Sequence, residues 1–271
     1  MSDDEIMVFA VCVIAGLAGA FYTRTSSLPF VYTKNNPGIG LLRLSVLAVV
    51  CWTAYVIQYH GDPSIQGIYV AFYLIMAYAV AKVFGQMGTS LYGLHLRSTV
   101  YERKNFAAAL FIAGYTIATG IIFGGSVWGE ADPLSDAEGG WWIPFGFFIL
   151  GWINFNIVTR IYLWREPGNF SSQICQERDT AVAWSATVFM VSTSTIILKG
   201  VAGDFWGWQH GILGMGTIAI MLVGHEVIGM IGDSAYNKTS LRIIERFVYI
   251  GLAAFVWFLN QIIDQAYVAG N

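Results

Sequence analysis

Long apolar stretches alternate with short polar connections along the whole chain. Eight such stretches lie at roughly 6–22, 40–59, 66–88, 105–125, 141–162, 180–199, 206–231 and 247–264. Each approaches or exceeds the length of about 20 residues that a helix needs to cross a bilayer. No connection between them is long enough to form a soluble domain. The pattern therefore predicts an all-α polytopic membrane protein of about eight transmembrane helices.

The composition supports this fold class. Hydrophobic residues make up 56% of the 271 residues and charged residues only 11%, whereas a soluble domain carries about a quarter charged residues. The first partner that we expect is therefore the lipid bilayer, with other membrane subunits or copies of the same chain as open alternatives and no nucleic acid. Three cysteines without C-x-x-C spacing predict free thiols.

Basic residues are concentrated in every second connection. They are Arg24 and Lys34; Arg97, Arg103 and Lys104; Arg160, Arg165 and Arg178; and Lys238, Arg242 and Arg246. The other connections are acidic or nearly uncharged, above all Glu130, Asp132, Asp136 and Glu138. The positive-inside rule then places the basic loops in the cytoplasm and both termini on the outer, periplasmic side of the cell membrane. The first apolar stretch lacks the basic residues that open a secretory signal, so we expect a retained helix.

A Glu-Arg pair stands before three of the apolar stretches, in Y-E-R-K-N-F, Q-E-R-D-T-A and I-E-R-F-V-Y. Arg43 is expected to take the same place without a Glu. Such a period indicates an internal repeat of two helices. Because each unit starts on the same side, the repeats are parallel, related by an axis along the membrane normal. The predicted boundaries are 1–39 for the first helix and its basic loop, 40–100, 101–175 and 176–243 for three repeats, and 244–271 for the last helix and outer C-terminus.

The stretch E-R-K-N-F-A-A-A-L-F-I-A-G-Y-T-I-A-T-G-I-I-F-G-G resembles the repeat of YjfL-type bacterial inner-membrane proteins, which opens with Asn and continues as an Ala-rich and Gly-rich helix. The resemblance covers roughly residues 40–264. It implies a multi-pass architecture in a bacterial inner membrane. It implies no activity, because that family has no settled biochemical function.

The Glu-Arg pairs have two interpretations. They could form charged gates at the inner mouth of a pathway, or they could fix orientation and contact anionic lipid. The pairs are Glu102 with Arg103, Glu177 with Arg178, and Glu245 with Arg246. The second interpretation is favoured, with each Glu in the first turn of an outward helix and paired with an Arg of a neighbouring unit.

A deeper polar group is the main functional hypothesis. Lys82, His225 and Glu226 fall five or six residues short of the cytoplasmic ends of their helices, roughly 8–9 Å into the membrane. Ionisable groups at that depth are costly and mark functional sites. Asn156 lies near the equivalent place in the middle repeat, so we expect the polar groups to converge, with a buried Lys82–Glu226 ion pair. This cluster could relay protons or simply hold the bundle together.

Other chemistry has little support. His60 and His210 are the candidate ligands of a haem b, the alternative to a protein without a cofactor. No nucleophile triad, phosphate loop or carboxylate metal cluster is present, so an enzyme is not predicted. The sequence thus predicts a channel or transporter for an ion or small solute, or alternatively a non-catalytic structural subunit of a larger membrane complex.

Overall fold

The computed structural model describes residues 2–22, 36–62, 65–129, 140–166, 168–202, 208–234 and 238–270. The helices are α1 (Asp3–Tyr22), α3 (Pro37–His60), α4 (Ile68–Val80), α5 (Phe106–Ser126), α6 (Trp142–Arg165), α7 (Phe170–Ser172), α8 (Thr180–Val201), α9 (Trp208–Ser234) and α10 (Lys238–Gly270). Shorter π-helical or 3₁₀ turns are η1 (Ala81–Met87), η2 (Gly88–Tyr92), η3 (Leu96–Glu102) and η4 (Gln173–Glu177). The acidic connection at 130–139, the residues Arg24 and Lys34 and residues 235–237 lie outside the described residues.

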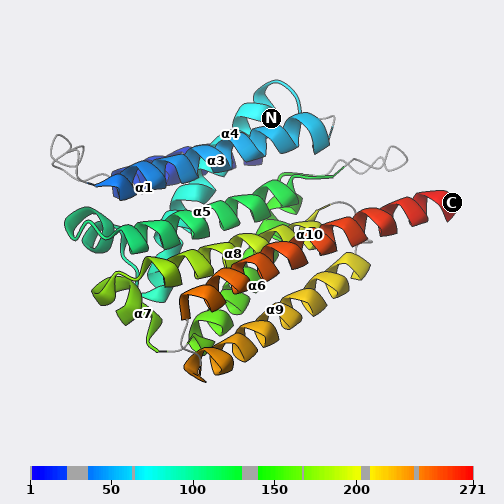
Figure 1. Ribbon diagram of the computed structural model, residues 1–271. Coiled ribbons are helices and arrows are strands. Elements are labelled where there is room, and N and C mark those ends of the chain that lie inside the picture. The colour runs from blue at the N-terminus through cyan, green and yellow to red at the C-terminus, as the bar shows by residue number, and fades with distance from the viewer. Residues whose placement is uncertain are drawn as a thin grey trace.

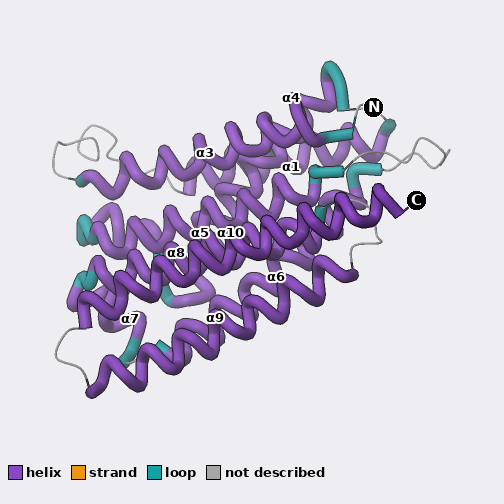
Figure 2. Tube along the Cα trace, turned by 45° about the vertical axis from the view of Figure 1, so that its right-hand side comes forward, coloured by secondary structure: helices purple, strands orange, loops and turns teal. Residues whose placement is uncertain are grey.

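Eight helices in the described part of the chain are long and apolar enough to cross a membrane, which confirms the predicted all-α polytopic class. The third of them joins α4, η1 and η2 into one span, Ile68–Tyr92. The last helix is longer than predicted, because α10 begins at Lys238 rather than near residue 247. The start of α1 and the end of α10 lie at the same end of the bundle (Figure 2).

The helices lie side by side in a row (Figure 1), and the row is two helices thick. In the first layer α3, α5, α8 and α10 run in the same direction and pack one against the next in that order. In the second layer α4 and η1 lie against α3 and α5, α6 lies against α5 and α8, and α9 lies against α8 and α10. Helix α1 packs mainly on α4 and η1 at one edge. The two-helix units therefore stand side by side, and this arrangement does not gather equivalent positions around a central axis.

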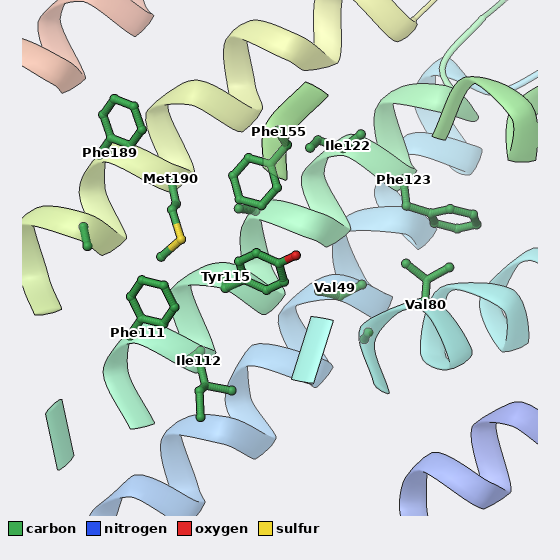
Figure 3. Packing of buried hydrophobic residues seen from close by; sticks show 14 of the residues in the cluster. Val49, Val80, Phe111, Ile112, Tyr115, Ile122, Phe123, Phe155, Phe189 and Met190 are labelled. Carbon is green, nitrogen blue, oxygen red and sulfur yellow. The ribbon is translucent and has the colours of Figure 1, made fainter. Parts of the chain in front are cut away.

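Side chains fill the centre of the row, where α5 and α8 are the most buried spans. Tyr115 of α5 packs on Phe155 of α6, with ring centroids 5.2 Å apart, inside the core shown in Figure 3. Small residues let neighbouring helices approach α5 closely: Gly120 faces Val49 of α3, and Gly114 faces Thr187 of α8.

An Asn or Asp side chain caps each of the two central helices. Asn105 Oδ1 accepts the Ala108 N–H at 3.1 Å, and Asp179 Oδ1 accepts the N–H groups of Ala181 and Val182 at 2.7 and 3.1 Å. These bonds satisfy backbone donors that a helix start leaves without intrahelical partners.

Asparagine side chains also tie the start of one helix of the first layer to the segment that precedes the next. Asn36 Nδ2 donates to the Val100 carbonyl at 3.0 Å, and Asn105 Nδ2 donates to the Ile174 carbonyl at 2.7 Å. Each acceptor stands five residues before the next capping side chain, since Val100 precedes Asn105 and Ile174 precedes Asp179 by that number. The same contact thus recurs from one unit to the next.

The Glu-Arg pairs do not mark equivalent places in this geometry. Glu102 and Glu177 end the short helices η3 and η4, so neither lies in the first turn of an outward helix as expected. The residue before each cap has positive φ, 51° at Lys104 and 56° at Arg178, which aligns Lys104 rather than Arg103 with Arg178. Arg43 lies inside α3, not before it.

Candidate functional site

Lys82 belongs to the first unit, in the π-helical turn η1. Its Nζ donates to Gln86 Oε1 at 3.0 Å and stands 5.8 Å from the centre of the Tyr78 ring. Gln86 is buried, and its Nε2 donates to the Leu42 carbonyl of α3 at 3.0 Å. A π-helical turn often accompanies a functional site, but here the polar side chains serve the contact between η1 and α3.

Asn156 of α6 is the centre of a separate hydrogen-bonded group. Its Oδ1 accepts the hydroxyls of Tyr92 at 2.8 Å and Tyr115 at 2.7 Å, and its Nδ2 donates to the Trp152 carbonyl at 2.7 Å. The two tyrosines were not predicted, since nothing in their apolar surroundings distinguishes them from core aromatics.

Glu226 of α9 pairs with Arg165, the last residue of α6, through two hydrogen bonds, one of them from Arg165 Nε at 2.5 Å. The pair is partly exposed, with 44% of the Arg165 side chain and 27% of the Glu226 side chain accessible. The expected Lys82–Glu226 ion pair is therefore wrong. The reason is the row of units, which places η1 and α9 in different units with different neighbours.

His225 occupies a buried polar site. Its Nδ1 lies 2.6 Å from Glu245 Oε1, and its Nε2 lies 3.8 Å from Glu166 Oε2. All three side chains are at most 3% exposed. The imidazole thus stands between two buried carboxylates from two different helical segments, the end of α6 and α10.

Aromatic side chains close this site toward the middle of the membrane. The Tyr162 ring lies 4.2 Å from the His225 ring, and Phe189 stacks on Tyr162 at 4.1 Å. Tyr249 donates its hydroxyl to Glu245 Oε1 at 2.5 Å. The Glu245 carboxylate is thereby held by two donors, the imidazole and the phenol.

Two arginines of α10 complete the cluster. Arg242 is paired with Glu166. Arg246 donates to Ser185 Oγ at 3.1 Å and to the Ala181 carbonyl at 2.8 Å, both on α8. Two carboxylates and two guanidinium groups around one histidine make a network that is neutral when the imidazole is neutral. Its histidine and carboxylates are buried, and both arginines are partly exposed. Removing one member from such a network leaves a charge without compensation.

His225 Nε2 and the carboxylate oxygen opposite it lack a proton to share in a hydrogen bond. When the neutral imidazole donates Nδ1–H to Glu245, its Nε2 carries only a lone pair. That lone pair faces Glu166 Oε2, which is also an acceptor, and neither atom has a hydrogen-bond partner in the described residues. The 3.8 Å separation is too long for a hydrogen bond. One proton on Nε2 would convert two opposed acceptors into a charge-assisted contact.

The predicted charge pairs contribute unequally to this site. Glu245 is buried in it, whereas Glu102 pairs with Arg97 of its own short helix at 3.5 Å, and both of those side chains are exposed. Arg178 donates to the Arg103 carbonyl at 3.2 Å, so it contacts backbone and not a neighbouring Glu. The expected pairing of each Glu with an Arg of another unit is therefore wrong for Glu102 and Glu245.

Sequence reasoning missed Glu166, Arg242, Tyr162 and Tyr249. Glu166 directly follows Arg165 at the end of an apolar stretch, and Arg242 had been counted among loop residues, so both had the pattern of solvated charges. Only the packing of α6, α9 and α10 brings these four residues close to His225.

The two candidate haem ligands have separate partners. The His60 ring stacks on Trp128 with centroids 3.8 Å apart, and His210 Nδ1 lies 2.8 Å from Asn260 Oδ1. His60 and His210 therefore belong to different helices of the row, α3 and α9, each with its own neighbours. No group of three or more His, Cys, Asp or Glu side chains in the described ranges could hold a metal ion.

Comparison with known proteins places the chain in a family without giving it an activity. A family model described as Domain of Unknown Function (DUF350) matches residues 63–201, just over half of the chain. The matched part includes Lys82, Asn156 and Glu166 but ends before His225 and Glu245. No curated protein and no solved structure matches the chain. The chain belongs to the DUF350 family of membrane proteins.

Proposed function

We propose that the protein is a membrane channel or transporter for an ion or small solute, and that the ion it moves, alone or with a solute, is the proton. The observation that supports this most directly is the position of His225 Nε2 opposite Glu166 Oε2, where two buried acceptors lack a donor between them. Histidine is the side chain whose charge changes most readily near neutral pH.

The charged side chains around His225 suit a histidine that binds and releases a proton. Glu166 and Glu245 face the imidazole with their carboxylates, and Arg242 compensates Glu166 when the imidazole is neutral. Neither protonation state then leaves a large net charge in a buried place. Lys82 and Asn156 have roles in other units, so the proposed site keeps His225 from the sequence hypothesis and gains Glu166 and Glu245.

A second polar site lies on α9 and α10, nearer the opposite end of the bundle. His210 and Asn260 bond to each other on α9 and α10. His210 is fifteen residues from His225, which is roughly 22 Å along a helix. Buried Met221 and Val256 lie on the stretches of α9 and α10 between the two places. Proton movement between them therefore requires a change in this packing, as in a transporter that opens to one side at a time.

The test is proton flux in proteoliposomes with a pH-sensitive dye inside, driven by a potassium diffusion potential with valinomycin. Wild-type protein should acidify or alkalise the lumen faster than protein-free liposomes. The variant His225→Gln keeps polarity but cannot hold the proton. We expect it to lose about 100-fold in flux, the lower end of what a positioned proton-transfer group contributes.

The control is Glu226→Gln, adjacent to His225 in sequence but paired outward with Arg165. It should retain flux while both variants remain monodisperse and helical by circular dichroism. Equal flux in wild type, His225→Gln and empty liposomes would contradict the proposal. Loss of flux in both variants would instead support a transport site that includes Glu226, as the sequence predicts.

The membrane and orientation belong to the same proposal. The resemblance to YjfL-type proteins favours a bacterial inner membrane. The excess of Arg and Lys at the end of the bundle that carries Arg97, Arg103, Arg165 and Arg178, here called the basic end, favours a cytoplasmic position for that end. Protons would then reach His225 from the cytoplasm.

A non-catalytic subunit of a larger complex is the second candidate. The partly exposed Arg165–Glu226 pair on the outside of α6 and α9 favours it, because another protein could cover these charges better than lipid. Replacing both residues with glutamine should then release a stoichiometric partner during purification. Unchanged association, or purification of the wild type alone, would contradict this function.

A further inference from the structure

A groove at the basic end is separate from the His225 cluster. It lies between η2, α6 and α7, has a volume of about 560 Å³, and is open to the surroundings. Leu91, Leu163 and Trp164 supply apolar walls, and Arg160, Asn169 and Ser171 supply polar groups. The described lining residues include one positive charge and no carboxylate.

Arg160 has no hydrogen bond or ion pair with any residue that the structure describes. This distinguishes it from Arg165 and Arg242, each paired with a glutamate. Arg160 is exposed on α6, five residues before Arg165, which is roughly 7–8 Å along the helix from its end. A guanidinium at that depth is costly unless an anion compensates it.

The other polar groups of the groove are also donors. Asn169 uses its Oδ1 to accept the Ser172 N–H at 3.2 Å, which leaves the amide NH₂ for another acceptor. No hydrogen bond of Ser171 Oγ to a described residue is present. A planar guanidinium, an amide NH₂ and a hydroxyl together suit an anion with several acceptor oxygens, and Arg is the preferred partner of phosphate.

We propose that this groove binds a phosphate ester, with Arg160 on the phosphate and the apolar walls along an attached hydrocarbon. The walls favour an anionic lipid over a soluble ester as the source. Leu91 and Trp164 are 54% and 77% exposed, respectively, which suits contact with acyl chains at the membrane boundary. The inference does not rest on proton transport.

Native mass spectrometry of the full chain in an uncharged detergent tests this with three ligands: dioctanoyl phosphatidylglycerol, dioctanoyl phosphatidylcholine and glycerol 3-phosphate. Wild type should bind phosphatidylglycerol most tightly. Arg160→Gln should weaken that binding about tenfold or more, because a charge-assisted hydrogen bond is lost. Arg103→Gln is the matched control, since Arg103 is exposed at the same end but does not line the groove.

Comparable binding of glycerol 3-phosphate, lost equally in Arg160→Gln, would support the phosphate site and make a soluble ester its ligand. Equal binding of both lipids by wild type, or equal losses in Arg160→Gln and Arg103→Gln, would overturn the proposal. If Arg160→Gln fails to fold, Arg160→Lys replaces it. It keeps the charge without the fork of donors and should weaken binding to a smaller extent, whereas unchanged binding would count against a phosphate contact.

Discussion

Replacing Asn105 with alanine should destabilise the protein more than any other single change at the capping positions. Asn105 is fully buried, and its side chain joins the start of α5 to the segment that precedes α8. Its oxygen accepts the Ala108 N–H, and its nitrogen donates to the Ile174 carbonyl. The alanine variant leaves both buried backbone groups without these partners.

The magnitude follows from that count. A buried polar group that loses its partner costs about 1–3 kcal/mol, so two such groups predict a loss of about 2–6 kcal/mol in the free energy of unfolding. Asn36 is the matched control, because it makes the equivalent bond to the Val100 carbonyl but no side-chain cap on α3, and it is only partly buried. Asn36→Ala should therefore cost only about 0.5–1.5 kcal/mol.

Equilibrium unfolding in mixed detergent and SDS micelles, followed by circular dichroism, measures both variants. Asn105→Asp separates the two bonds, since it keeps an acceptor for Ala108 but turns a second acceptor toward the Ile174 carbonyl. We expect it to be less stable than wild type. A difference between Asn105→Ala and Asn36→Ala below about 0.5 kcal/mol, the usual error of comparing independent sites, would refute the reasoning.

Two further predictions concern the charged cluster and the orientation. Glu166→Gln should cost about 1–3 kcal/mol in unfolding free energy by leaving the partly buried Arg242 without its carboxylate, while changing both residues to methionine should recover much of that loss; a single variant as stable as wild type would contradict the ion pair. Alkaline phosphatase fused after Asn271 should be active and green fluorescent protein at the same place dark, whereas the reverse would place the C-terminus in the cytoplasm.

The membrane class and the number of spans could be predicted from the sequence because both depend on local composition. A stretch of about 20 apolar residues satisfies its own backbone hydrogen bonds as a helix whatever surrounds it. Helix limits were less accurate, since α10 starts well before its apolar part. The polar turn around Glu245 and Arg246 is helical because His225, Tyr249 and Ser185 supply partners for its charges.

The site could be predicted only in part. His225 was singled out because a histidine inside an apolar stretch is unusual in any sequence. Its partners could not be identified, because Glu166 and Glu245 are separated from it along the chain and resemble loop charges.

What the sequence by itself determined is therefore the presence of the apolar helices, because hydrophobic length is a local property of the chain. Which polar groups meet was decided by the tertiary structure. Units that stand in a row keep Lys82, Asn156 and His225 in separate contacts, whereas a ring would have brought them together. The choice between row and ring depends on close packing between helices, such as Gly120 on Val49 and Gly114 on Thr187, and on the Asn105 bond to Ile174. Those contacts join residues far apart in the chain, so no local pattern specifies them.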